Sequence, residues 1–208
     1  RKKEKYGGAI SKKNFLNKNK TFGFIGFGDL AKATLPLIRP FSNSILAYDP
    51  WLAKLKIKSK NVIPTSLKNI LKKSDIIFVF ATSTSTNNQM LNSKNLNLIR
   101  DSSTILIMSR ASVVNFKDLY KFLKTRDVFA GIDVFPQEPF SKTNPLRKLK
   151  NVVFSPHRAG ALDCVFKQMG EIVIKDMKLI NNGLKPKNCK KAELKTVKKI
   201  ISKPVTVN

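Results

Sequence analysis

The stretch that decides the fold is TFGFIGFGDLA, residues 21–31. A short apolar run, residues 22–25, precedes Gly26, Gly28 and Ala31, which have the spacing GxGxxA. In that spacing the first glycine permits a tight turn, the second lets the backbone approach a diphosphate, and the small third residue lets a helix pack closely on the strand. The stretch predicts a strand, a glycine turn and a helix whose N-terminus faces an anion. The alternative is an ordinary glycine turn in an α/β unit.

The next apolar run ends in ILAYDP, residues 45–50, and so places Asp49 at a strand end. It stands about 20 residues after the glycines, where a carboxylate accepts hydrogen bonds from the ribose hydroxyls of an adenosine and repels a 2′-phosphate. This favours NAD over NADP, although Lys54 and Lys56 lie close enough in sequence to leave NADP open. Asp49 and the proline after it could equally begin a turn.

Apolar runs of strand length alternate with segments of helical period as far as residue 183. The expected strands are 21–26, 44–48, 75–81, 104–108, 128–134 and 152–154, and the expected helices are 30–41, 67–73, 116–124 and 162–182. The strand DIIFVFA is apolar on both faces, as in a parallel sheet that helices cover on each side. We predict an α/β fold with a doubly wound parallel sheet and a C-terminal helix that stops at Gly183.

Composition limits the class of protein. The 208 residues are 42% hydrophobic, which suffices for one sizeable core and is too apolar for a disordered chain. No apolar run reaches the roughly 18 residues of a membrane span, and no signal peptide is visible. Two cysteines, Cys164 and Cys189, supply neither a disulfide framework nor a four-thiolate zinc site. We expect a cytoplasmic protein with no metal site.

The charge balance is strongly basic, with 40 basic and 13 acidic residues and a net charge of +27. Such a field attracts nucleic acids and anionic membranes. Only seven of the cations are arginines, the residue preferred for forked contacts with phosphates and guanines. The lysines are spread along the chain beside many asparagines, isoleucines and phenylalanines, which indicates an A/T-rich genome. We expect neither a nucleic-acid partner nor a membrane partner.

Three residues with acid, base or anion-binding chemistry follow expected strands. His157, the only histidine, comes just after the last strand, at the edge where ligands bind in open α/β sheets. It is the only imidazole available for acid or base catalysis near neutral pH. The alternative is that His157 is a surface or core residue with no catalytic role. Arg110 follows STILIMS, and Glu138 follows Asp133 in GIDVFPQEP. Singly these are loop charges; together, an arginine can hold a substrate carboxylate in a forked pair, and a carboxylate favours the protonated form of an imidazole.

The order of the motifs GFGDLA, YDP, SRA, GIDVFPQEP and SPHRAG resembles that of the D-isomer-specific 2-hydroxyacid dehydrogenase family over residues 21–183. The resemblance implies a Rossmann fold that binds NAD, in an oxidoreductase that transfers a hydride between NAD(H) and a small D-2-hydroxy acid/2-oxo acid pair, such as those of glyoxylate, hydroxypyruvate or 3-phosphoglycerate. It implies that Arg110 binds the substrate carboxylate and carbonyl, that His157 protonates the carbonyl oxygen, and that Glu138 pairs with His157. The alternative is a non-catalytic NAD-binding regulatory module.

The resemblance also implies a set of cofactor-binding residues: Gly26, Gly28, Asp29, Leu30, Asp49, Ala81, Thr82, Asn87, Met108, Ser109, Arg110, Asp133, His157, Ala159 and Gly160. Two positions depart from the family pattern. Asp29 stands where basic residues are frequent, near the cofactor phosphates, and is expected to weaken binding. Ala111 stands where glycine usually follows the arginine, which predicts backbone strain if φ there is positive.

We expect three segments along the chain: a linker or the end of an N-terminal lobe at 1–20, the NAD-binding Rossmann domain with the catalytic residues at 21–183, and a basic tail at 184–208 that packs on a substrate lobe. Family members carry an N-terminal half that forms most of this second lobe. The chain opens on Arg1 without a methionine. We therefore expect a nearly inactive fragment of a longer homodimeric enzyme.

Overall fold

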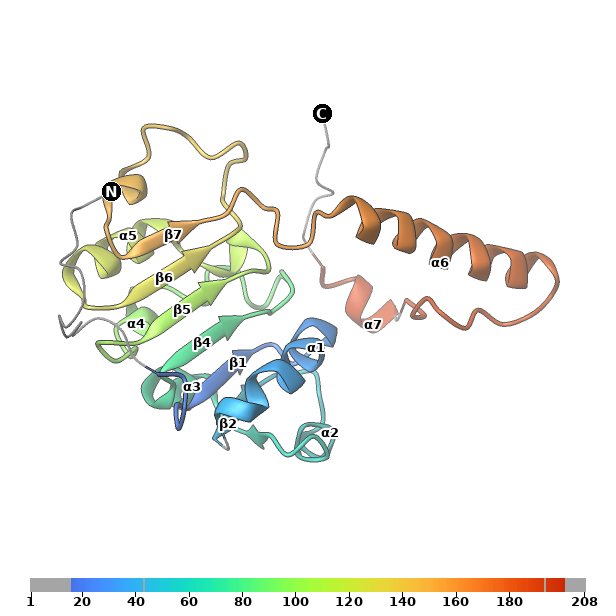
Figure 1. Ribbon diagram of the computed structural model, residues 1–208, viewed down its shortest axis with the longest axis horizontal. Helices are drawn as coiled ribbons and strands as arrows, with labels where there is room; N and C mark the ends of the chain where they lie inside the picture. Colours follow the sequence, from blue (N-terminus) through green and yellow to red (C-terminus); the bar gives the residue numbers. More distant parts are fainter. Residues whose placement is uncertain (1–15, 43, 193, 201–208) are drawn as a thin grey trace, which may run out of the picture.

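The centre of the computed structural model, which describes residues 16–42, 44–192 and 194–200, is a seven-stranded parallel sheet of order β3-β2-β1-β4-β5-β6-β7 (Figure 1). The order reverses between β1 and β4, where the chain passes from one half of the sheet to the other. The predicted doubly wound parallel sheet is thus confirmed. The strands are β1 (Phe22–Ile25), β2 (Ile45–Tyr48), β3 (Ile63–Pro64), β4 (Ile76–Val79), β5 (Thr104–Ile107), β6 (Phe129–Ile132) and β7 (Val152–Phe154).

The helices cover both faces of this sheet. The four predicted helices are present, and the short helices α2, α4 and α7 were not predicted. The α-helices are α1 (Asp29–Ile38), α2 (Lys54–Lys58), α3 (Leu67–Lys73), α4 (Ser93–Leu96), α5 (Phe116–Thr125), α6 (Asp163–Asn181) and α7 (Leu194–Val197). Three 3₁₀ turns join them: η1 (Arg39–Phe41), η2 (Ala111–Val113) and η3 (Pro145–Lys148).

Two hydrophobic clusters, one on each face, hold the helices to the sheet. One contains Phe22 and Phe24 of β1 with Leu35 of α1 and Ile57 of α2. The other contains Ile25 of β1 and side chains from α3, α4 and α5. Successive residues of β1 thus enter opposite clusters, and all four are buried. This arrangement explains why the central strands are apolar on both faces.

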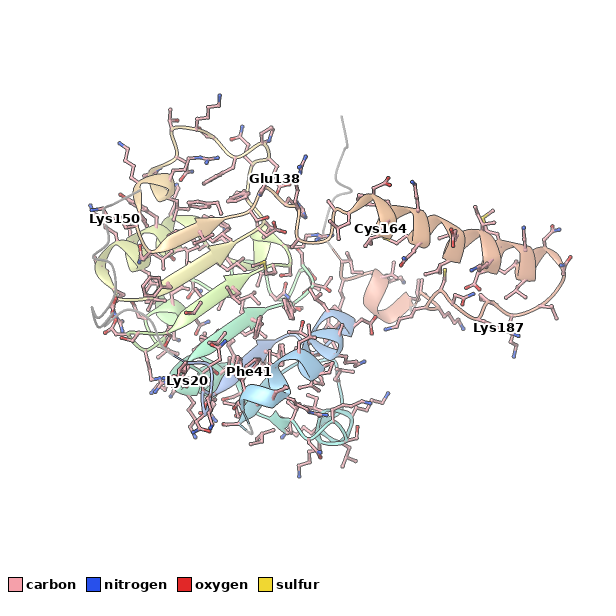
Figure 2. The ribbon with its side chains drawn as sticks, viewed as in Figure 1. Lys20, Phe41, Glu138, Lys150, Cys164 and Lys187 are labelled. Atoms are coloured by element: carbon pink, nitrogen blue, oxygen red, sulfur yellow. The ribbon has the colours of Figure 1, made fainter. Side chains whose placement is uncertain are left out.

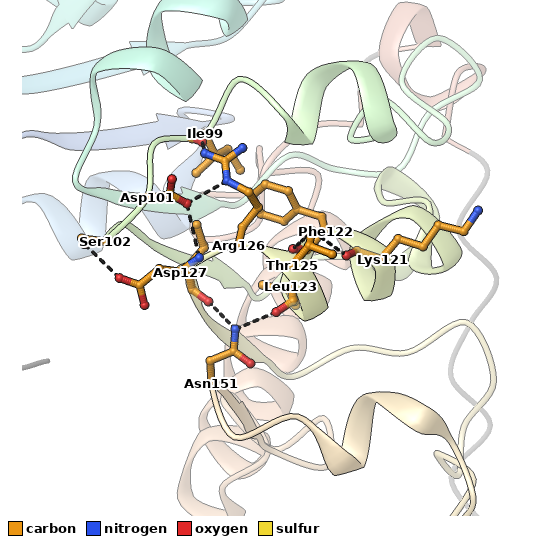
Figure 3. A network of polar contacts seen from close by, with 11 residues as sticks. Ile99, Asp101, Ser102, Lys121, Phe122, Leu123, Thr125, Arg126, Asp127 and Asn151 are labelled. Atoms are coloured by element: carbon orange, nitrogen blue, oxygen red, sulfur yellow. Dashed lines mark hydrogen bonds and ion pairs between the residues drawn. The ribbon is translucent and has the colours of Figure 1, made fainter.

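A polar network fixes the edge of the sheet where the strands begin (Figure 3). Arg126, just after α5, donates from Nε to Asp101 at 2.7 Å and from Nη2 to the carbonyl oxygen of Ile99 at 3.0 Å. Asn151, just before β7, donates from Nδ2 to the carbonyl oxygens of Leu123 and Val128 at 2.9 and 2.7 Å. These bonds anchor the amino ends of β5, β6 and β7 and leave their carboxyl ends for ligands.

Helix α6 leaves the sheet and extends away from it, and its side chains project outward (Figures 1 and 2). It ends before Gly183, whose φ is +70°, as the glycine predicted. Large apolar side chains along it are exposed, and its one buried residue is Asp176. The tail after α6 folds back beside it, with α7 lying between α6 and α1 (Figure 1).

Two expectations from the sequence concern the ends of the chain and Ala111. Residues 1–15 of the expected linker and residues 201–208 of the expected tail lie outside the described residues. Ala111 begins η2 and is not among the described residues with positive φ, so the condition under which strain was expected there is not met. Within the described residues, no helix is both long and apolar enough to cross a membrane.

Candidate functional site

The glycine turn between β1 and α1 uses its two glycines for different purposes. Gly26 has φ +91°, and a Cβ on it would lie 2.6 Å from the backbone nitrogen of Ala81, just beyond β4. A side chain there would be strained and would push β1 and β4 apart. Gly28, the N-cap of α1, faces open space, because a Cβ on it would meet nothing within 4 Å. A ligand can therefore approach the backbone of Gly28 at the helix N-terminus, where unpaired N–H groups favour an anion.

Asp49 joins the end of β2 to this turn. Its Oδ2 accepts a hydrogen bond from the backbone N–H of Phe27 at 2.8 Å. Its Oδ1 accepts from the N–H groups of Trp51 and Leu52 at 2.9 and 3.2 Å. An ionised carboxylate has about four acceptor sites, and these bonds use three of them, so one further donor such as a ribose hydroxyl can still bind. The expected ribose position thus lies directly beside the expected diphosphate position.

The arrangement of these groups fits a dinucleotide. The open backbone at Gly28 matches a diphosphate, and the partly exposed Asp49 matches the ribose next to it. Lys54 and Lys56 are exposed, and neither forms an ion pair with Asp49 among the described residues. Within the described residues, neither lysine thus neutralises the Asp49 carboxylate, whose negative charge disfavours the 2′-phosphate of NADP.

Asp29, the first residue of α1, forms an ion pair that the sequence did not predict. Its carboxylate accepts a hydrogen bond from Nζ of Lys190 in the tail and lies 3.9 Å from Nζ of Lys32. The hydrogen bond from Lys190, with the charges of Lys190 and Lys32, lowers the pKa of Asp29. The two partners are 161 residues apart in sequence, so no local pattern could indicate the contact.

The loop after β4 holds the predicted residues Ala81, Thr82 and Asn87, and Asn87 braces it. The Oδ1 of Asn87 accepts from the N–H of Thr84 at 2.8 Å, and its Nδ2 donates to the carbonyl oxygen of Thr82 at 2.7 Å. Behind them, the hydroxyls of Ser83 and Ser112 lie 2.6 Å apart. The loop is thereby tied to η2, which begins directly after Arg110.

At the end of β5, Met108 and Ser109 lead to Arg110, which is exposed. The guanidinium donates from Nη1 to the carbonyl oxygen of Ser109 at 2.8 Å. It makes no hydrogen bond or ion pair with Glu138 or His157 among the described residues. The buried hydroxyl of Ser109 has no partner there either. The end of β5 is thus in the expected place, but the guanidinium of Arg110 bonds to the backbone of the preceding residue.

Glu138 and His157 are brought together from two different loops. The Nδ1 of His157, after β7, lies 2.8 Å from Oε2 of Glu138, after β6, and both side chains are about two-thirds buried. The other carboxylate oxygen, Oε1, accepts from the backbone N–H of Phe135 at 3.0 Å. His157 has φ +55°, a left-handed conformation that is uncommon for residues other than glycine. Glu138 thus orients the ring through Nδ1 and leaves Nε2 for another group.

Asp133, at the end of β6, fixes the segment that carries the histidine. Its side chain is buried, and its two oxygens accept from the N–H groups of Arg158 and Ala159 at 2.9 and 3.2 Å. Gly160 follows, with no atom within 4 Å of where its Cβ would lie. The carboxylate therefore serves at least as a backbone anchor for residues 157–160, and the surface beyond Gly160 is open.

A cavity of about 630 Å³ opens beside the Glu138–His157 pair. Phe135, Phe140 and Phe154 line it together with Arg147, whose guanidinium carbon lies 4.7 Å from the ring centroid of Phe140. None of these four residues was predicted from the sequence, where the available signal was three phenylalanines within three residues of Glu138 or His157. Among the described residues, no group of three His, Cys, Asp or Glu side chains could hold a metal ion.

Comparison with known proteins points to one family. A sequence model described as the D-isomer specific 2-hydroxyacid dehydrogenase, NAD-binding domain, matches residues 2–159. A glyoxylate reductase from Korarchaeum cryptofilum is 31% identical, over 86% of this chain and 54% of that protein. A D-3-phosphoglycerate dehydrogenase from Methanocaldococcus jannaschii is 28% identical, over 79% of this chain and 32% of that protein.

Among solved structures, a phosphoglycerate oxidoreductase from Rhizobium etli is 37% identical, with a TM-score of 0.79 over 88% of this chain and 58% of that chain. The Rossmann fold implied by the resemblance is thus confirmed. The chain spans about half the length of the glyoxylate reductase and a smaller share of the phosphoglycerate dehydrogenase.

Proposed function

Because the chain belongs to the D-isomer-specific 2-hydroxyacid dehydrogenase family, we propose that it forms the cofactor-binding and catalytic part of an enzyme that interconverts a small D-2-hydroxy acid and its 2-oxo acid. NAD is the cofactor of the matched domain. The substrates in the names of the relatives, glyoxylate and 3-phosphoglycerate, are the first candidates. The observation that carries the proposal is the Glu138–His157 contact at the carboxyl edge of the sheet that also holds Gly28 and Asp49.

The residues assigned to NAD are those that surround the carboxyl edge. Gly28 and the N-terminus of α1 would hold the diphosphate, and Asp49 would hold the adenosine ribose. The strand ends and loops that carry Met108, Asp133 and Gly160 would surround the nicotinamide. When bound, NAD(H) supplies or accepts the hydride.

In our mechanism, His157 moves the proton. Its Nδ1 is engaged by Glu138, so Nε2 donates a proton to the carbonyl oxygen of a 2-oxo acid and takes it back from the hydroxyl in the reverse direction. The carboxylate of Glu138 stabilises the imidazolium and fixes the orientation of the ring. Arg110 would leave the Ser109 carbonyl and form a forked pair with the substrate carboxylate. This rotation requires only side-chain movement, because Arg110 is exposed.

The rest of the enzyme would cover the surfaces that this chain leaves open. We assign the apolar side of α6 and the tail from residue 184 to contacts with a substrate lobe, which corresponds to the part of the relatives outside the match. We also propose that the full-length enzyme forms a homodimer and lies in the cytoplasm. Closure of that lobe would exclude water from the site. Because this chain alone lacks the lobe, we expect little turnover from it.

Titration of the chain with NADH and NADPH, with Asp49→Ala in parallel, tests the cofactor assignment. We expect saturable binding that favours NADH and a loss of about tenfold in NADH affinity in the variant, the size expected for a charged hydrogen bond. Asp163→Ala, which removes an exposed carboxylate from α6, is the matched control. Equal affinity of wild type and Asp49→Ala would contradict the assignment of Asp49.

The catalytic assignment is tested in a protein that contains this chain together with the substrate lobe. There, His157→Gln should lower kcat by at least about a hundredfold, the usual contribution of a general acid, with NADH affinity within twofold of wild type. NADH binding with no turnover of glyoxylate, hydroxypyruvate or 3-phosphohydroxypyruvate in the unaltered protein would favour the regulatory module instead.

A further inference from the structure

The tail crosses the carboxyl edge of the sheet and contacts the glycine turn and the loops after β2 and β4. Lys190 pairs with Asp29 at the glycine turn. The Nζ of Lys199 lies 6.0 Å from the ring centroid of Trp51, two residues after Asp49. The carbonyl oxygen of Lys199 accepts from the N–H of Ser85, in the loop after β4, at 3.0 Å. The tail thus contacts three segments that border the expected adenosine half of the dinucleotide site.

The tail is also anchored on its other side, by Asp176 of α6. The Oδ1 of Asp176 accepts from the backbone N–H of Lys187 at 3.0 Å and from Nδ2 of Asn188 at 2.8 Å, and Oδ2 accepts from the N–H of Cys189 at 2.5 Å. The anchored residues directly precede Lys190. Its position beside Asp29 is therefore set by hydrogen bonds on both sides of it along the tail.

Asp29 creates an electrostatic problem at the glycine turn. It directly follows Gly28, so its carboxylate stands at the helix N-terminus that would receive a diphosphate, and like charges at such a position repel. The Nζ of Lys32, one helical turn away, lies 3.9 Å from the Asp29 carboxylate, which is too far for a hydrogen bond. The Nζ of Lys190, in contrast, is within hydrogen-bond distance of that carboxylate. Lys190 is thus the cation best placed to offset this charge.

We propose that Lys190 is a cofactor-site residue, supplied by the tail, that neutralises Asp29 so that the glycine turn can accept the diphosphate of a dinucleotide. The inference rests on the proposed function and adds to it a residue from outside the segment matched by the family model. It also explains how this chain can carry an acidic residue where the family often has a basic one. The tail is then part of the cofactor site in addition to any contact with a substrate lobe.

NADH titration of four forms of the chain tests this: wild type, Lys190→Met, Asp29→Asn and the double variant. Two exposed charges a few ångströms apart interact weakly in water, so we expect Lys190→Met to lower NADH affinity about fivefold. In the Asp29→Asn background the same substitution should change affinity less than twofold, because no carboxylate is left to neutralise. Lys191→Met is the matched control, since Lys191 is exposed and forms no ion pair among the described residues, and it should bind NADH like wild type.

Two results of the NADH titration would overturn the inference. Tighter NADH binding in Lys190→Met would mean that the tail competes with the cofactor, and an equal loss in both backgrounds would mean that Lys190 acts independently of Asp29. The contact itself has a separate readout, because NMR titration of the Asp29 carboxyl carbon should show a higher pKa in Lys190→Met than in wild type. Absence of this rise refutes the ion pair, whereas a normal rise without NADH binding by any form refutes the cofactor assignment and this inference with it.

Discussion

The sheet and helix α6 are both rich in apolar residues, but the sheet buries them and α6 leaves them exposed. In the sheet, Ile25 and Ile77 are fully buried between helices of the same chain. On α6, Phe166, Ile174 and Met177 are more than half exposed, and the one buried residue is the carboxylate of Asp176. The Rossmann domain therefore finds its packing partners within the chain. Helix α6 does not, and the exposure of its apolar side chains is the observation on which we base its proposed contact with a substrate lobe.

The strongest test of this contrast is the same substitution in both regions. Ile77→Ala removes three carbons from a fully buried position in β4, and we expect it to lower the free energy of unfolding by about 4 kcal/mol, because a cavity remains. Ile174→Ala on α6 should change it by less than about 0.5 kcal/mol, as for other exposed positions. Urea denaturation of the chain measures both values.

A large loss of stability in Ile174→Ala would break the comparison. It would show that α6 is already packed in solution, against a second copy of the chain. The midpoint of unfolding would then depend on protein concentration, which separates this outcome from an error in the burial of Ile174.

The two glycines of the β1–α1 turn extend the contrast to the site. Gly26→Ala places a Cβ 2.6 Å from the Ala81 nitrogen at a positive φ, and we expect a loss of about 3 kcal/mol in the free energy of unfolding. Gly28→Ala meets no atom and should leave the free energy of unfolding nearly unchanged while it weakens NADH binding. If both variants unfold at the wild-type urea concentration, the close approach of β1 and β4 is wrong.

The sequence predicted the elements whose apolar residues recur with a regular period. It did not predict short elements that bury one residue or none. Helix α3 and strand β7 match the prediction residue for residue, because their apolar residues face a core in a regular pattern. Strand β3 has only two residues, one of them Pro64, and α2 buries only Ile57, so neither carries a period. Local pattern alone cannot reveal such elements.

The site divides in the same way. The positions of Gly26, Gly28 and Asp49 follow from spacing, since a Rossmann turn needs those residue types there. The 2.8 Å contact of Glu138 with His157 joins two loops. The chemistry of the two residues suggested this pair and the resemblance implied it, and the catalytic roles of both residues stay a prediction. The pairing of Asp29 with Lys190, and of Asp176 with the tail, depends on how the chain folds back after α6. No local sequence pattern encodes that return.

The smallest expected effect concerns the tail's anchor on α6. The hydrogen bond from Cys189 and those from its two preceding residues lower the pKa of Asp176. A carboxyl whose pKa falls on folding adds stability above its ordinary pKa, near 4, and loses it as the pH falls further. The tail should therefore stay docked at neutral pH and detach only in acid.

Asp176→Asn should loosen the same anchor at neutral pH, with Cys189 as the reporter. Desolvation and the neighbouring Asp176 raise the pKa of the Cys189 thiol, so removing the carboxylate increases the thiolate fraction and the access of a reagent. We expect Cys189 to react about threefold faster with a disulfide reagent at pH 7.5, since thiolate is the reactive species. Cys164, in the first turn of α6, serves as the internal reference, and Glu171→Gln removes an exposed charge from the same helix as the control. An unchanged Cys189 rate in Asp176→Asn would mean that the carboxylate does not hold the tail, and the position of Lys190 at the glycine turn would then depend on Asp29 and on the contacts of Lys199 alone.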